Sequence, residues 1–298
     1  MGGIIMLKGA FSAIITPMTA DGQVDYEGLK KHIEFQIQNG INGIVPCGTT
    51  GESATLSHDE HKQVVKTVVE QVNGRVPVIA GAGSNSTKET IALTQFAKDI
   101  GADAALVITP YYNKPTPAGL IAHYKATAEV GIPIVIYNVP GRTGINIQPA
   151  VVAELAREKN IVALKDAANN LAQTSETIRL INDDSFTVLS GEDGMLYPMM
   201  SLGVQGVISV SANIIPGDMA ALCKAALDGD YVKARALHYK LAPLCAAMFY
   251  ETNPIPIKKA LELLGHGSAY WRLPLVAPKP ETVQKLTAAL QAYGLNVS

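Results

Sequence analysis

A strict alternation of two kinds of segment constrains the fold of this chain more than any other feature of its sequence. Eight short, nearly all-apolar runs occur along the chain, each typical of a parallel strand that is covered on both faces. Longer segments with helical spacing of apolar residues separate these runs. The runs are 11–18, 43–48, 77–83, 104–110, 133–140, 161–167, 186–193 and 206–213.

This repeated strand–helix unit predicts an α/β fold. Alternating units imply a parallel sheet, and eight of them favour a closed (β/α)8 barrel, the TIM barrel, over an open sheet. N-cap residues support several helix starts, at Asp25, at Ser57 and at Ser86 or Thr87. Ser57 and Glu60 also have the spacing of a capping box.

The last part of the chain contains helical patterns without strands. We expect helices at about 230–249, 253–264 and 280–293. The predicted organisation is therefore a barrel with the active site at 1–228 and a C-terminal helical extension at 229–298.

Composition excludes several classes of partner. The net charge is −2 and no Lys/Arg-rich run occurs, so neither nucleic acid nor an anionic membrane is expected as a partner. Three widely spaced cysteines, Cys47, Cys223 and Cys245, fit unpaired thiols in a reducing cytoplasm. We find neither a signal peptide nor an apolar run long enough to span a membrane, and we expect a cytoplasmic protein.

In such a barrel the active site lies at the carboxyl ends of the strands. The run IVALKDA places Lys165 at one of these ends, where a cation is costly to bury. One interpretation is structural: Lys165 reaches the surface or pairs with Asp166. The other is chemical, because burial lowers the pKa of an amine and a free amine can attack a ketone to form a Schiff base.

Other strand ends supply residues that suit a small anionic carbonyl compound. Tyr137 ends the neighbouring strand and is either a proton shuttle or a core aromatic residue. Thr49 and Thr50, flanked by glycines, form either a carboxylate-binding loop or an ordinary tight turn. Arg142 follows Pro-Gly and either binds a second carboxylate or makes a surface ion pair.

Metal and phosphate chemistry fit the sequence poorly. No histidine stands at a strand end, and His58 and His61, spaced i,i+3, read better as a polar helix face than as a metal site. The GED segment at the end of the seventh run repels anions where barrels often bind phosphate. GTTGES also lacks the P-loop pattern. We expect no metal and no cofactor, including pyridoxal phosphate on Lys165.

Six motifs resemble the 4-hydroxy-tetrahydrodipicolinate synthase (dihydrodipicolinate synthase) family, and the resemblance covers essentially the whole chain. This family belongs to a superfamily with N-acetylneuraminate lyase and the 2-keto-3-deoxy sugar acid aldolases. The motifs are GTTGES at 48–53, TPYYN at 109–113, YNVPGRTG at 137–144, the lysine of ALKDA, GVISVSAN at 206–213 and ETNPIPIK at 251–258.

The resemblance implies a lyase that condenses pyruvate with L-aspartate 4-semialdehyde through a lysine Schiff base. This reaction is the first committed step of lysine and diaminopimelate biosynthesis. By the resemblance, Lys165 forms the Schiff base and Tyr137 is the general acid and base. Thr49 and Tyr112 complete a proton relay, with Tyr112 donated by a neighbouring subunit of a homotetramer built from two tight dimers.

The resemblance also implies the substrate contacts. Thr50 holds the pyruvate carboxylate, Arg142 binds the carboxylate of the semialdehyde, and backbone groups of Gly191 and Ile208 lie near the substrate. An arginine in YNVPGRT favours a short acid aldehyde over a sugar.

Feedback inhibition by L-lysine is a further expectation from the resemblance. In lysine-inhibited members a cleft at the tight dimer interface binds the amino acid, and this chain has every matching residue. They are Ser53, Ala54, His58, His61, Asn85, Glu89 and Tyr111.

One segment departs from the family pattern. The family usually has Lys-Glu-Ala followed soon by Gly-Asp, whereas this chain has Asp166 and then Ala-Ala-Asn-Asn at 167–170. We expect the Schiff base to survive, and the preference for the second substrate stays open. Two other functions remain as alternatives: a 2-keto-3-deoxy acid aldolase that uses the same lysine, and a barrel that only binds ligands or partners.

Overall fold

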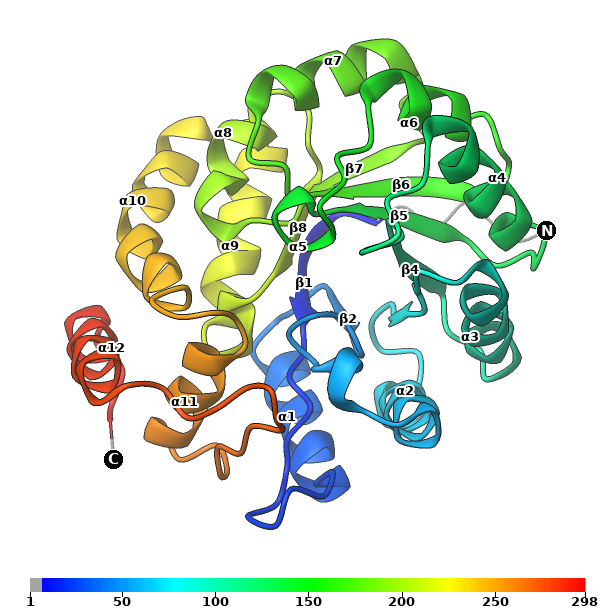
Figure 1. The fold of residues 1–298 in the computed structure, drawn as a ribbon. Helices are drawn as coiled ribbons and strands as arrows, with labels where there is room; N and C mark the ends of the chain where they lie inside the picture. Colours follow the sequence, from blue (N-terminus) through cyan, green and yellow to red (C-terminus); the bar gives the residue numbers. More distant parts are fainter. Residues whose placement is uncertain (1–6, 298) are drawn as a thin grey trace.

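A computed structural model describes residues 7–297 of the chain, and it confirms the (β/α)8 barrel. Eight parallel strands alternate with helices around one axis (Figure 1). The strands are β1 Gly9–Ala13, β2 Gly43–Val45, β3 Ile79–Gly81, β4 Ala104–Ile108, β5 Ile134–Asn138, β6 Ile161–Asp166, β7 Thr187–Ser190 and β8 Gly206–Ser209.

Helices follow the strands and continue beyond the last one. The α-helices are α1 Tyr26–Gln38, α2 His58–Val72, α3 Thr87–Asp99, α4 Pro117–Ala128, α5 Pro140–Thr143, α6 Pro149–Leu155, α7 Leu171–Ile181, α8 Leu196–Met200, α9 Pro216–Leu227, α10 Tyr231–Ala247, α11 Ile255–Leu263 and α12 Pro280–Tyr293. Three short 3-10 helices are η1 Ser53–Thr55, η2 Asp193–Met195 and η3 Ser211–Asn213.

The sheet closes on itself between β2 and β3. The hydrogen-bonded order of strands is β2-β1-β8-β7-β6-β5-β4-β3, so β2 and β3 are the two ends of the series. A parallel bridge joins Ile44 to Val78, and the backbone N–H of Gly81 donates to the carbonyl of Pro46 at 2.9 Å. These contacts bring the edges together, as a barrel requires.

Most strands are shorter than the apolar runs that predict them. β2 ends at Val45 because Pro46 has no N–H to continue the ladder. The first run was misplaced by the prediction: β1 begins at Gly9 and ends at Ala13, so Thr16 and Pro17 lie in the loop that follows. The carboxyl end of this first run is thus a buried loop rather than part of the strand.

Alternation along the strands divides the apolar side chains into two cores. One fills the barrel interior, and the other lies between the sheet and the helices. Ala163 belongs to the interior and Leu164 to the outer core. By the same alternation Lys165 faces the interior and Asp166 faces the helices.

Local capping signals were mostly read correctly from the sequence. Asp25 accepts a hydrogen bond from the N–H of Gly28 at 2.8 Å, and Ser57 forms the predicted capping box with Glu60. Ser86 stands at the N-cap of α3 but its side chain makes no capping hydrogen bond.

The helices after the barrel match the predicted segments to within a few residues. α10 packs against α9 and α12, and α11 packs against α12 (Figure 1). α11 is also joined to the loop after β2, because Lys258 forms an ion pair with Glu52 in which both side chains are almost completely buried. Within residues 7–297, no helix has the length and apolar character needed to cross a membrane.

Removing one partner of the Glu52–Lys258 pair leaves an uncompensated buried charge. We predict that Lys258→Met lowers the free energy of unfolding by about 3–5 kcal/mol, measured by urea unfolding. The double variant Glu52→Gln with Lys258→Met should recover part of this loss. The matched control is Lys224→Met, which breaks an exposed pair with Asp228 and should cost less than about 1 kcal/mol. Equal losses in both single variants would contradict the assignment.

Candidate active site

Lys165 and Tyr137 lie side by side at the carboxyl ends of β6 and β5. The parallel register pairs these two residues directly, and both side chains face the barrel interior. Lys165 is 7% exposed, and its Nζ lies 4.1 Å from the centroid of the Tyr137 ring. The structure therefore places a largely buried amine against a phenol, as the sequence predicted.

Asp166 does not pair with Lys165. Its Oδ1 accepts hydrogen bonds from Asn138 Nδ2 at 3.2 Å and from the N–H of Ala168 at 3.1 Å. Its Oδ2 accepts from Thr174 Oγ1 at 2.9 Å. The carboxylate thus ties β6 to β5 and α7 on the outer side of the sheet. This arrangement rules out the structural interpretation in which Asp166 neutralises the lysine.

The end of β7 packs closely against Lys165. The N–H of Gly191 donates to the carbonyl of Asp166 at 2.7 Å. A Cβ at Gly191 would lie 3.1 Å from Lys165 Cε and 2.8 Å from the Cβ of Ala167, so this position has no room for a side chain. Ile208, on β8, is 1% exposed and belongs to the interior core. Tyr137 and Gly191 therefore confine the lysine from two neighbouring strands.

Glu192 follows Gly191, and its backbone is held by the side chain of Ser190. Ser190 Oγ donates to the carbonyl of Glu192 at 2.8 Å and accepts from its N–H at 3.1 Å. Partial burial raises the pKa of Glu192 to about 7, with a further rise from the charge of Asp193 and an opposing effect of Lys165. A carboxyl group that titrates near neutral pH therefore borders the lysine site, which sequence reasoning did not identify.

The loop after β2 presents Thr49 and Thr50 and is fastened at several points. Thr50 is 2% exposed, and its Oγ1 accepts a hydrogen bond from Asn253 Nδ2 at 3.0 Å. Thr16 Oγ1 donates to the carbonyl of Gly51 at 2.7 Å. Glu52 has a left-handed φ of 53°, which is unfavourable for a glutamate, and its ion pair with Lys258 holds it there.

Arg142 lies on the short helix α5 at the end of β5. Its guanidinium is exposed, and Nη2 donates to the backbone carbonyl of Asn253 at 3.0 Å. The other N–H groups of the fork are available to a ligand. Arg142 therefore contacts the same C-terminal segment that holds Thr50.

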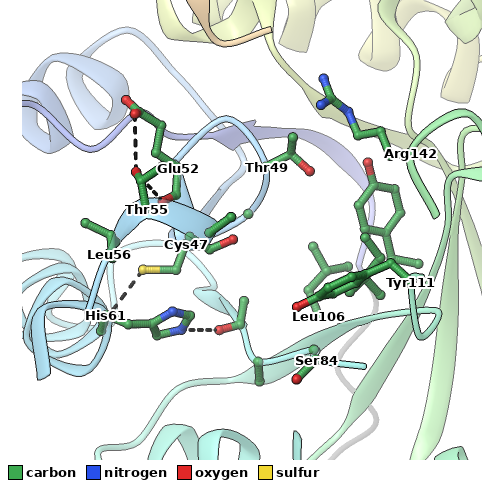
Figure 2. A pocket seen from close by; sticks show the side chains of 18 of the residues that line it. Cys47, Thr49, Glu52, Thr55, Leu56, His61, Ser84, Leu106, Tyr111 and Arg142 are labelled. Carbon is green, nitrogen blue, oxygen red and sulfur yellow. Dashed lines mark hydrogen bonds between the residues drawn. The ribbon is translucent and has the colours of Figure 1, made fainter. Parts of the chain in front are cut away.

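A cavity of about 480 Å³ opens beside these residues, and Figure 2 shows its walls. From the predicted catalytic and substrate-binding set, Thr49, Tyr137 and Arg142 line it. From the set that the resemblance associates with L-lysine, every member except Asn85 lines it as well. These are Ser53, Ala54, His58, His61, Glu89 and Tyr111.

Asn85 and five residues of the first set, of which Tyr112 is described below, do not line this cavity. Lys165, Thr50, Gly191 and Ile208 lie in or beside the barrel mouth, as described above. The carbonyl of Asn85 accepts from Asn113 Nδ2 at 2.8 Å, which joins its loop to the TPYYN segment. The structure therefore groups most of the predicted residues at one end of the barrel.

His58 and His61 have different partners although they share one helix. His61 is buried, its Nε2 lies 2.7 Å from the carbonyl of Gly81, and burial lowers its pKa. His58 Nε2 lies 2.9 Å from Glu89 Oε1. Glu89 also accepts a hydrogen bond from Ser84 Oγ. The two imidazoles are therefore parts of the cavity wall rather than a ligand pair.

Tyr112 is separate from the rest of the predicted site. It is 89% exposed and has a φ of 73°, a conformation that is strained for a tyrosine. It does not line the cavity, whereas the adjacent Tyr111 does (Figure 2). Tyr112 thus extends into solvent, whereas Lys165 is largely buried in the barrel.

Three residues that hold the loop after β2 were given no role by the sequence analysis. They are Asn253, Glu52 and Lys258. The motif ETNPIPIK was recognised as part of the resemblance, and that was the available signal. Its contacts with a loop about 200 residues earlier could not be read from local patterns.

Comparisons with known proteins agree with this geometry. The family model described as the dihydrodipicolinate synthetase family matches residues 6–293. The chain belongs to this family. A relative from Oleidesulfovibrio alaskensis, named 4-hydroxy-tetrahydrodipicolinate synthase, is 53% identical over 293 residues, covering 98% of this chain and 100% of the relative. The chain is thus an enzyme of the aldolase-type lyases.

Two solved structures are similar over nearly the whole chain. A chloride-inhibited dihydrodipicolinate synthase from Acinetobacter baumannii, in complex with pyruvate, is 45% identical with a TM-score of 0.95, and the match covers 97% of this chain and 100% of that one. The enzyme from Cyanidioschyzon merolae with lysine bound is 38% identical with a TM-score of 0.94, covering 97% and 98%.

The raised pKa of Glu192 makes a prediction about stability and pH. The carboxyl group of Glu192 binds its proton more tightly in the folded state than in the unfolded state. Its protonated form therefore adds to the free energy of unfolding. This stabilisation is fully present below about pH 4.5 and is lost as the pH rises through about 7. Glu192→Gln should therefore become more stable relative to the parent by about 1–2 kcal/mol between pH 5 and 8, after allowance for solvent screening. Urea unfolding across this range measures the difference.

The matched control is Glu176→Gln, because Arg179 lowers the pKa of this exposed carboxylate. That variant should lose relative stability as the pH rises through the acid range, which is the opposite sign. A stability difference for Glu192→Gln that is independent of pH would contradict the assignment.

Proposed function

We propose that this enzyme condenses pyruvate with L-aspartate 4-semialdehyde to give 4-hydroxy-tetrahydrodipicolinate, the first committed step of lysine and diaminopimelate biosynthesis. The observation that carries the proposal is the buried Lys165 amine, 4.1 Å from the Tyr137 ring and without a carboxylate partner in Asp166. The family of the chain and the pyruvate complex of the Acinetobacter baumannii relative support it.

The chemistry begins at Lys165. Its free amine attacks the keto carbon of pyruvate, and loss of water leaves a Schiff base. This group withdraws electrons, so a proton leaves the methyl carbon and an enamine forms. The enamine carbon then bonds to the aldehyde carbon of the semialdehyde, whose oxygen takes up a proton. The amino nitrogen of the semialdehyde finally attacks the imine carbon, which breaks the bond to Lys165, closes the ring as a cyclic imine and returns the free amine. Tyr137, beside the amine, moves the protons in these steps as general acid and base.

The remaining predicted residues bind and orient the substrates. Thr50, through its hydroxyl and backbone, takes the pyruvate carboxylate, and Arg142 takes the carboxylate of the semialdehyde. Backbone groups of Gly191 and Ile208 line the reacting centre. No metal or cofactor enters this scheme, because the Schiff base itself is the electron sink.

Thr49 and Tyr112 complete a proton relay to Tyr137 in this proposal. Thr49 borders the cavity with Tyr137, whereas Tyr112 extends from its own subunit. Its strained φ and 89% exposure support insertion into the site of a neighbouring subunit. We therefore propose a homotetramer built as a dimer of dimers. The buried, unpaired thiols at 47, 223 and 245 suit the proposed cytoplasmic location.

L-Lysine is the proposed feedback inhibitor. Glu89 has the charge to pair with an ammonium group, and His58 and Tyr111 offer polar contacts in the same cavity. The lysine-bound relative from Cyanidioschyzon merolae supports this assignment. Asn85 is the predicted member whose side chain lies outside the cavity walls of this subunit.

Trapping with borohydride tests the proposed reaction. We predict that incubation with pyruvate followed by reduction adds one reduced pyruvate to the intact protein, located at Lys165 by peptide mass spectrometry. Lys165→Met should give no adduct, whereas Lys159→Met at an exposed position should give the parental adduct. An unlabelled parent, or an adduct at another lysine, would refute the mechanism. Turnover with the semialdehyde but not with sugar aldehydes then separates a synthase from a 2-keto-3-deoxy acid aldolase.

Inhibition by L-lysine is expected to depend on the charge of Glu89. We predict that millimolar L-lysine slows the parent enzyme and that Glu89→Gln raises the half-inhibitory concentration about tenfold or more, because a charged hydrogen bond is lost. Steady-state rates over a lysine titration provide the measurement. Glu70→Gln is the control, at an exposed site on α2 that does not line the cavity, and it should be inhibited like the parent. If L-lysine leaves the rate of the parent enzyme unchanged, the proposed feedback inhibition is wrong.

A further inference from the structure

Asn253 occupies a position in the C-terminal segment that no catalytic role explains. It is 4% exposed, it precedes α11, and it borders the cavity together with Arg142 and Thr49. Its side-chain Nδ2 donates to Thr50 Oγ1 at 3.0 Å, across 203 residues of sequence. Its backbone carbonyl accepts from Arg142 Nη2 at 3.0 Å. One residue therefore contacts both groups to which the two substrate carboxylates have been assigned.

We propose that Asn253 is a positioning residue for pyruvate, which holds the Thr50 hydroxyl so that its hydrogen is directed to the substrate carboxylate. This inference rests on the proposed function, because it needs a carboxylate at Thr50.

The hydrogen-bonding capacity of a threonine hydroxyl gives the reason. Such a group has one hydrogen to donate and lone pairs to accept. When Thr50 Oγ1 accepts from Asn253, the hydroxyl keeps its single hydrogen for an anion, and the accepted bond makes that hydrogen a stronger donor. Without Asn253 the buried hydroxyl would lose the hydrogen bond that fixes its orientation.

Asn253 can act in this way because its segment is itself fixed. The N–H of Ile255 donates to the carbonyl of Thr252 at 2.9 Å, and the next turn of α11 carries Lys258, which pairs with Glu52. The C-terminal extension therefore contacts the 48–52 loop at two positions, through a hydrogen bond to Thr50 and an ion pair with Glu52. A rigid support of this kind is what a preorganised binding group requires.

The two contacts of Asn253 can be separated experimentally because they use different atoms. The contact with Thr50 uses the side chain, whereas the contact with Arg142 uses the backbone carbonyl. A side-chain substitution therefore removes the first and leaves the second. The affinity for pyruvate should fall, whereas the affinity for the semialdehyde should be nearly unchanged.

The experiment measures borohydride trapping as a function of pyruvate concentration, together with the KM for the semialdehyde at saturating pyruvate. For Asn253→Ala we expect the half-saturating pyruvate concentration to rise about tenfold, and the KM for the semialdehyde to change less than about threefold. Asn253→Asp, which is isosteric, should be worse than Asn253→Ala, because a carboxylate draws the Thr50 hydrogen away and repels the substrate.

A double-mutant cycle separates positioning from general structural support. If Asn253 acts through the hydroxyl of Thr50, adding Asn253→Ala to Thr50→Val should raise the pyruvate requirement no further. Glu251→Gln is the control in the same segment, and it should match the parent, since Glu251 contacts the N–H of Lys279 rather than the cavity.

Three results would overturn the inference: additive effects in the cycle, equal rises for both substrates, or a parental pyruvate requirement in Asn253→Asp. Failure of this inference is distinguishable from failure of the proposed function. In the first case the parent still forms the Lys165 adduct, and in the second it forms none.

Discussion

Parallel pairing of β5 with β6 fixes the chemistry of this barrel. Residues in register on neighbouring parallel strands point to the same face, so the pairing of Tyr137 with Lys165 places phenol and amine together without any further interaction. On the other side, the absence of a side chain at Gly191 leaves room for the Lys165 side chain, because a Cβ there would lie 3.1 Å from Lys165 Cε. The amine is thus confined by the Tyr137 ring and the backbone at Gly191, and within residues 7–297 it forms no ion pair with a carboxylate. That confinement allows a lysine to remain inside an apolar core as a nucleophile.

The same two-residue period explains why Asp166 can follow the lysine directly. Lys165 faces the interior, and Asp166 faces the helices, where Asn138, Thr174 and a backbone N–H use its carboxylate. The carboxylate of Asp166 therefore takes part in how β6 joins β5 and α7, and not in the surroundings of the amine. The same carboxylate also fixes the start of the loop at 167–170, because it accepts from the N–H of Ala168.

Features that depend on local sequence were predictable, and those that depend on distant contacts were not. The apolar runs predicted the strands, and Asp25 and Ser57 predicted helix starts, because strand burial and capping act within a few residues. Lys165 and Tyr137 followed from strand ends plus barrel order. The contact of Asn253 with Thr50 joins residues 203 apart, and no periodicity encodes it. Glu192 was read as a charge that repels anions, whereas its burial, which decides its pKa, is a tertiary property.

The loop after β2 connects the two groups of residues around the cavity. Thr49 and Thr50 stand before Glu52, and Ser53 and Ala54 follow it, so the proposed catalytic and lysine-binding positions are separated by a few bonds. Glu52 is held in its left-handed conformation by Lys258 from the C-terminal extension. A ligand shifts an equilibrium only through different affinities for two states, and an anchored Glu52 opposes movement of the loop as a unit. Coupling across this cavity would then depend on charge and side-chain positions within it rather than on a displaced backbone.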